Sequence, residues 1–207
     1  MIDAQKLREI LHATAQCIEA KKDELTELDN AIGDGDHGIN MARGFIAVDA
    51  KLASLSSTDL GALLKGVGMA LVSTVGGASG PLYGTAYMQA GKALKGKTEA
   101  NLTDLETALQ AAVAGIQMRG KAQEGDKTML DALCPAVRAL SAAIQAQKHA
   151  HEVLDAMAKA ALDGAEATKK IIAKKGRASY LGERSLGHQD PGATSMAYIL
   201  DTLAKLA

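Results

Sequence analysis

Apolar residues recur at helical spacing along almost the whole chain. Apolar residues at intervals of three and four positions predict a helix or helix pair over residues 3–32. The same spacing predicts a second helix through Met41, Phe45, Val48 and Leu52. Further helices are expected over about residues 59–75, 81–94, 103–120, 149–174 and 192–206, and another opens at residues 125–128 and contains Pro135. No segment shows the alternation of a convincing strand. The pattern is that of an all-α protein with about eight helices.

Capping residues set several of the expected helix ends. Thr58 or Asp59 can cap the third helix, and Pro81 suits the first position of the next one. Thr103 and Glu106 have the spacing of a capping box, and Pro135 is expected to kink its helix. Short loops favour antiparallel neighbours, so we expect an up-and-down bundle, with closure into a barrel as one form of it.

Composition and charge exclude several classes of protein. The formal net charge is −1 and there is no basic arm, which argues against a nucleic-acid partner. We interpret Lys169, Lys170, Lys174 and Lys175 as a solvated helix face, because acidic residues lie close to them in the sequence. The length fits one domain spanning residues 1–207.

Cysteine usage and the apolar runs indicate a cytoplasmic protein. Cys17 and Cys134 are isolated within helical patterns, so buried reduced thiols are expected. The first residues are polar, which predicts no signal peptide, and no apolar run is long enough to cross a bilayer. No membrane partner is therefore expected.

The polar residues with chemical potential are concentrated in four loops. These loops cover residues 29–40, 76–81, 120–129 and 176–192. They follow the first, third, fifth and seventh helices, and alternate loops of an up-and-down bundle lie at the same end. The topology therefore predicts that all four loops meet in a single site.

Three carboxylates in the first loop suggest a cation site. Asp29, Asp34 and Asp36 lie within eight residues on a Gly-rich loop and offer hard oxygen ligands, which suit Mg²⁺ or Ca²⁺. An EF-hand is excluded, because Phe45 or Asn40 stands where the closing acidic ligand would be. Mg²⁺ completed by phosphate oxygens fits better, and an acidic surface turn is the alternative.

The other loops suggest phosphate binding. Gly76 to Gly80 precede a helix, so their backbone N–H groups and the helix N-terminus could bind phosphate, although a flexible turn is the alternative. Arg177 could neutralise phosphate charge or belong to a solvated cluster with Glu183 and Arg184. His37 and His188 are each either a proton carrier or a hydrogen-bonding loop residue.

Four sequence segments together resemble a known family. They are Ala31 to Gly38, Gly76 to Gly84, Gly125 to Met129, and Lys175 to Gly182 with Asp190 to Ser195. In this order they resemble the nucleotide-binding L subunit of bacterial dihydroxyacetone kinase over essentially the whole chain. The resemblance implies a barrel of eight antiparallel helices with the nucleotide at one rim.

The resemblance also implies a set of ligands and site residues. Two Mg²⁺ ions would bridge the phosphates of ADP or ATP to Asp29, Asp34 and Asp36. Nucleotide contacts carry over to His37, Gly38, Ile39, Asn40, Ala78, Ser79, Gly120, Met129, Arg177, Asp190, Pro191 and Gly192, with backbone groups of Gly77 to Gly80 orienting the phosphate. Arg177 and His37 are the candidate catalytic residues.

The implied reaction needs two further proteins. Dihydroxyacetone would be held on a separate K subunit, and a phosphohistidine protein of the sugar phosphotransferase system would recharge the bound ADP. The alternatives are a subunit that uses free ATP, a nucleotide-binding adaptor that docks on a transcription regulator, and a carboxylate or fatty-acid kinase subunit. All three Asp residues and Arg177 are present, which favours catalysis over docking alone.

Overall fold

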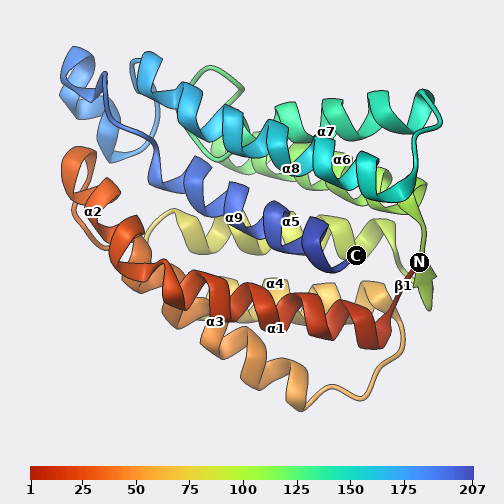
Figure 1. The fold of residues 1–207 in the computed structure, drawn as a ribbon. Helices are drawn as coiled ribbons and strands as arrows, with labels where there is room; N and C mark the ends of the chain where they lie inside the picture. The colour runs from red at the N-terminus through yellow and green to blue at the C-terminus, as the bar shows by residue number, and fades with distance from the viewer.

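Nine α-helices follow one another in the computed structural model, which describes residues 1–207 (Figure 1). They are α1 (Ala4–Ala20), α2 (Lys22–Ile32), α3 (His37–Ala53), α4 (Leu60–Thr74), α5 (Ser79–Ala93), α6 (Leu102–Gly120), α7 (Leu130–Gln145), α8 (Ala150–Ala167) and α9 (Pro191–Leu206). Two 3₁₀ helices, η1 (Thr168–Lys170) and η2 (Arg177–Ser185), lie between α8 and α9. The predicted all-α class is confirmed.

The helices form a closed ring. Each helix from α3 to α8 packs against the next one in the chain, and α9 packs against both α8 and α1. α1 and α2 are consecutive segments that meet at Lys21, so together they occupy one position in the ring. The expected up-and-down arrangement is therefore confirmed, and it closes into a barrel around one continuous apolar core. No helix is long and apolar enough to span a bilayer.

Glycines allow α4 and α5 to pack with their backbones almost in contact. A Cβ atom at Gly68 would lie 2.6 Å from the carbonyl oxygen of Gly84, and one at Gly84 would lie 2.8 Å from that of Gly68. Only glycine permits this approach. The α4–α5 hairpin is consequently tight.

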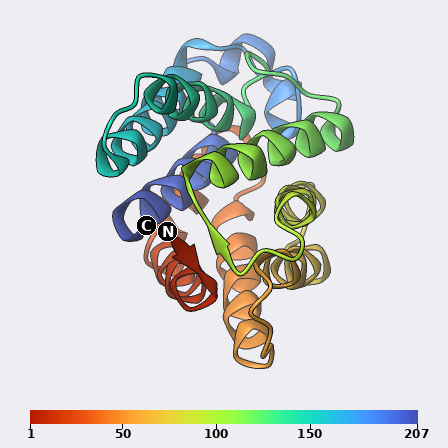
Figure 2. The same ribbon diagram turned by 90° about the vertical axis from the view of Figure 1, so that its right-hand side faces the viewer.

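One short strand pair was not predicted. β1 (Ile2–Asp3) and β2 (Glu99–Ala100) pair antiparallel, with Ile2 opposite Ala100. Two residues are too few to produce an alternating pattern. The pair lies at the end of the barrel where both chain termini are found (Figure 2), and the polar loops lie at the other end (Figure 1).

Several predicted helix ends were wrong. The long helix expected over 149–174 ends at Ala167, where η1 begins. The capping box of α6 is formed by Asn101 and Asp104 rather than by Thr103 and Glu106, because the extended β2 strand ends at residue 100. Asn101 accepts from the Asp104 N–H at 2.9 Å, and the Asp104 carboxylate accepts from the Asn101 N–H at 3.1 Å.

Two helices also begin at positions other than expected. α5 starts at Ser79, two residues before Pro81, so its first turn includes Gly80, whereas Gly76 and Gly77 precede the helix. α7 starts only at Leu130, because the Asp131 carboxylate accepts from the N–H groups of Gly125 and Thr128 and holds residues 125–128 in a turn.

Candidate functional site

The four polar loops meet at one end of the barrel, as their alternation predicted. They connect α2 to α3, α4 to α5, α6 to α7 and α8 to α9. Together they line an open cleft of about 1020 Å³. The site is thus assembled from segments more than 150 residues apart in the sequence.

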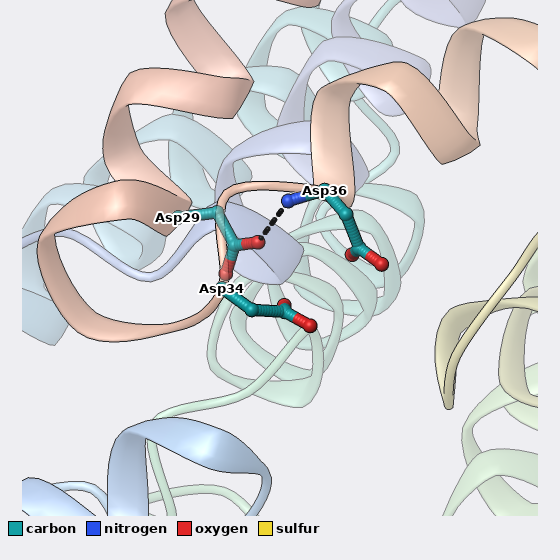
Figure 3. A group of neighbouring side chains, drawn as sticks. All are labelled: Asp29, Asp34 and Asp36. Atoms are coloured by element: carbon teal, nitrogen blue, oxygen red, sulfur yellow. Dashed lines mark hydrogen bonds between the residues drawn. The ribbon is translucent and has the colours of Figure 1, made fainter.

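The acidic residues of the first loop form a compact cluster. One carboxylate oxygen from each of Asp29, Asp34 and Asp36 lies within 4.8 Å of the others. Figure 3 shows the three side chains on the loop between α2 and α3. Asp29 accepts from the backbone N–H groups of Asp36 at 2.9 Å and His37 at 3.1 Å, which ties the end of α2 to the start of α3. Asp36 precedes α3 without capping it, so its carboxylate is free to bind a ligand.

Asp29 is the buried member of this cluster. Desolvation raises the pKa of Asp29, and the neighbouring charges of Asp34 and Asp36 raise it further, although the two N–H donors oppose both effects. A cation placed among the three carboxylates would offset this repulsion. The donor set consists of oxygen alone, which is the set that Mg²⁺ prefers.

The second loop presents the start of α5 to the cleft. Gly77 has φ of +64°, a left-handed conformation that glycine adopts without strain, and there is open space where its Cβ would be. No side chain caps α5, and Ala78 and Ser79 at its start line the cleft. This geometry suits an anion at the positive end of the helix.

His37 links this helix start to α9. Its Nε2 lies 2.8 Å from the Ser195 hydroxyl and its Nδ1 lies 3.2 Å from the Ser79 hydroxyl. The Tyr83 hydroxyl joins the same network, since it donates to the Gly192 carbonyl at 2.9 Å and lies 2.7 Å from the Ser195 hydroxyl. Burial lowers the pKa of His37 to about 4, so the ring is neutral near pH 7. Both ring nitrogens are occupied by protein hydroxyls, which favours the hydrogen-bonding role over proton transfer.

The fourth loop brings Arg177 opposite the acidic cluster. Nη2 of Arg177 lies 2.8 Å from Oδ2 of Asp34. Asp190, at the end of the same loop, caps α9 by accepting from the Ala193 N–H at 2.7 Å. Burial raises the pKa of Asp190 to about 7. Arg177 therefore pairs with the triad across the cleft, whereas Glu183 and Arg184 do not line the cleft.

The cleft contains most of the residues that the sequence singled out. Those that line it are Asp29, Asp34, Asp36, His37, Gly77, Ala78, Ser79, Gly120, Met129, Arg177, Asp190, Pro191 and Gly192. Gly38, Ile39, Asn40 and Gly80 lie outside its wall. Gly38 is pressed against the Lys22 carbonyl of α2, and Asn40 accepts from Arg43 at 2.6 Å. His188 is exposed and does not line the cleft.

Comparison with known proteins gives the chain a family. Residues 31–205 match the DAK2 domain. The chain belongs to the DAK2 domain family. Of the triad, Asp34 and Asp36 lie within the matched DAK2 region and Asp29 lies two residues before it.

Two relatives of similar length are ADP-binding subunits. The chain is 44% identical over 183 residues to the ADP-binding subunit of the PEP-dependent dihydroxyacetone kinase of Escherichia coli, covering 88% of this chain and 87% of that subunit. It is also 44% identical to the ADP-binding subunit of PEP-dependent dihydroxyacetone kinase 2 of Listeria innocua, covering 99% of this chain and 97% of that subunit.

A solved DAK2-like structure has the same fold. The dihydroxyacetone kinase of C. freundii superposes with a TM-score of 0.75 at 30% identity, over 96% of this chain and 34% of that chain. This chain therefore spans about a third of the length of that kinase chain. The same kinase in complex with AMP-PNP and Mg²⁺ gives a TM-score of 0.72.

Several residues of the DAK2 cleft were missed by sequence reasoning. Lys174 and Lys175 were assigned to a solvated helix face, but they lie in a loop and line the cleft, because α8 ends earlier than expected. Arg119 and Tyr180 also line it. Lys127 is almost completely buried, and nothing in the periodicity distinguishes a buried lysine from an exposed one. Its only signal was its place in the segment Gly125 to Met129.

Proposed function

We propose that this chain is the ADP-binding subunit of a PEP-dependent dihydroxyacetone kinase. A phosphoryl group passes from its nucleotide to dihydroxyacetone held on a separate K subunit, and a phosphohistidine protein of the sugar phosphotransferase system recharges the ADP in place. The observation that carries the proposal is the placement of Arg177 opposite the acidic triad in a cleft that the start of α5 also borders. Identity of 44% to two such subunits supports it.

The acidic triad would hold the metal. Asp29, Asp34 and Asp36 offer oxygen ligands in one cluster, and the proposal assigns two Mg²⁺ ions to them. When bound there, Mg²⁺ supplies charge neutralisation for the phosphate oxygens. Asp29 contributes a second function, since its two backbone contacts keep the start of α3 in register with the end of α2.

The remaining residues would orient the phosphates. The uncapped N-terminus of α5, with Ser79 in the cleft wall, would offer backbone N–H groups to an anion, and Gly77 leaves room for it. Arg177 supplies a planar guanidinium that can donate two parallel hydrogen bonds to phosphate oxygens. His37 holds Ser79 and Ser195 in place as a neutral ring, so we assign it a positioning role.

Reconstitution tests the proposed function. The purified chain is mixed with a K subunit, dihydroxyacetone, PEP and the soluble proteins of a phosphotransferase system, and dihydroxyacetone phosphate is measured. We expect product only when all components are present. A chain that binds nucleotide but gives no product with any ketone-loaded K subunit would contradict the proposal and favour an adaptor, for example one that docks on a transcription regulator.

A further inference from the structure

Lys127 carries a positive charge into the interior beside the cleft. Only 1% of the residue is exposed. Its Nζ donates to three backbone carbonyls, those of Ile171 at 3.2 Å, Ser185 at 2.5 Å and His188 at 2.6 Å. An ammonium group has three N–H donors, so each donor has one acceptor. Burial lowers the pKa of the Lys127 ammonium, and the nearby carboxyl groups of Asp190 and Asp131 oppose that shift.

The three carbonyls belong to residues on both sides of Arg177 in the sequence. Ile171 precedes η2, and Ser185 and His188 follow Arg177 at the other end of the segment. The residue before Lys127 adds a fourth tie, because the Asp126 carbonyl accepts from the Lys174 N–H at 3.1 Å. Residues 126 and 127 thus join the incoming and outgoing ends of the segment 171–188 to the loop 121–129.

The backbone conformation of Lys127 is also unusual for a residue with a side chain. Its φ is +63°, in the left-handed region that a lysine rarely adopts. The conformation directs the side chain inward, whereas a glycine at this position would relieve the strain but lose the three hydrogen bonds. Between its two ends the segment contains Gly176 and Gly182, both at positive φ with open space around them. The segment can bend at these two glycines, so its conformation depends on contacts made at its two ends.

We propose that Lys127 is a positioning residue that holds Arg177 opposite the acidic triad by joining the two ends of its segment. The inference rests on the proposed function for the role of Arg177 in phosphoryl transfer. Loss of the Lys127 ammonium would leave three buried carbonyls without a donor and would free the segment, while the barrel helices, which pack through the apolar core, would stay in place.

A double-mutant cycle with Arg177 tests this proposal. Transfer rates at saturating K subunit are measured for the wild type, Lys127→Met, Arg177→Ala and the double variant. We expect Lys127→Met to slow transfer by roughly tenfold. In the Arg177→Ala background the same change should cost less than about twofold, because residues that act through one another are not additive. Lys159→Met, an exposed lysine paired with Asp163 on α8, is the matched control and should transfer at the wild-type rate.

Hydrogen exchange provides a readout that does not depend on activity. Amides of residues 171–188 should exchange faster in Lys127→Met, while those of α4 and α5 should be unchanged. If Lys127→Met does not fold, Lys127→Arg is measured in its place. It retains the charge, but a planar guanidinium cannot direct three donors from one nitrogen, so the same local increase is expected.

Three results would overturn the proposal. They are multiplicative losses in the double variant, faster exchange throughout the barrel, and failure of both Lys127 variants to fold. A wild-type chain that transfers to no ketone would instead remove the proposed function. The exchange experiment would still decide whether Lys127 holds the segment.

Discussion

Arg177 and Asp34 form an ion pair across the mouth of the cleft, with Nη2 2.8 Å from Oδ2. The guanidinium is two-thirds exposed, so such a pair contributes about 1 kcal/mol or less. A phosphate for Arg177 and a divalent cation for Asp34 would each form a stronger charge-assisted contact. The pair therefore aligns the two residues without preventing them from exchanging partners.

Replacement of one triad carboxylate should weaken nucleotide binding without unfolding the chain. In Asp34→Asn or Asp36→Asn, a charged metal ligand is lost next to phosphate charge. Charge-assisted contacts are worth about 1.5–3 kcal/mol, so we expect the affinity for Mg²⁺ and ADP to fall by tenfold or more. Calorimetric titration measures the affinity, and circular dichroism should report unchanged helix content.

A surface carboxylate provides the control for the triad variants. Asp155→Asn changes an exposed residue on α8, outside the residues that line the cleft, and should bind like the wild type. Full retention of ADP by Asp36→Asn at low Mg²⁺ would show that the triad does not bind the metal.

Arg177→Lys should affect transfer more than binding. Lysine keeps the charge but cannot offer the planar pair of donors. We expect the transfer rate to fall by roughly tenfold or more, with a smaller change in nucleotide affinity, as for a contact made chiefly in the transition state. Arg184→Lys alters an arginine at the other end of η2, outside the cleft, and is the matched control. Equal transfer rates for both variants would show that Arg177 is a solvated surface residue without a role in transfer.

The sequence predicted the site better than it predicted the helix ends. Alternation of polar loops with apolar helices was sufficient to bring Asp34 and Arg177 together, because an up-and-down topology leaves few other arrangements. The end of α8 was missed because residues 168–174 retain a helical composition, and Thr168 is buried as an acceptor for the Asp190 N–H, a contact of tertiary structure. Lys127 was missed for the same reason, since its acceptors are backbone carbonyls that no side-chain pattern reveals.

The pH dependence of stability should reveal the environment of Asp190. Burial raises the pKa of this carboxyl from an ordinary value near 3.8 to about 7, so the folded state holds its proton more tightly than the unfolded state does. Its contribution to stability is therefore fully present below about pH 4 and is lost as the pH rises toward 7. Asp190→Asn lacks this titration and keeps an oxygen for the Ala193 N–H, because Asn caps helices about as well as Asp.

Comparison of the wild type with Asp190→Asn isolates the titration of the Asp190 carboxyl. Free energies of unfolding are measured from pH 4 to pH 8 without nucleotide. The wild type should lose stability relative to Asp190→Asn across this range, by on the order of a few kcal/mol, and the difference should level off above pH 7. A constant difference would mean that Asp190 is ionised throughout and that the charge of nearby Lys127 outweighs burial.

The time that ADP stays bound distinguishes a phosphohistidine protein from free ATP as the phosphoryl donor. Three carboxylates, the N-terminus of α5 and Arg177 all border one cleft, and together they could hold a magnesium diphosphate tightly. Differences in affinity are expressed mainly in dissociation rates, so tight binding implies slow release. A subunit that released ADP in every cycle would be limited by that step, whereas recharging by a phosphohistidine protein avoids it.

Turnover with each donor therefore distinguishes the two mechanisms. The chain loaded with ADP is mixed with a K subunit and dihydroxyacetone, and either excess ATP or the phosphorylated phosphotransferase protein is added. We expect sustained turnover with the phosphoprotein and at most about one turnover with ATP, over a time shorter than the exchange of labelled ADP. The Asp36→Asn variant, which should not retain ADP, is the control and should be inactive with both donors. Rapid multiple turnover on ATP alone would show that the nucleotide is a substrate that leaves after each transfer.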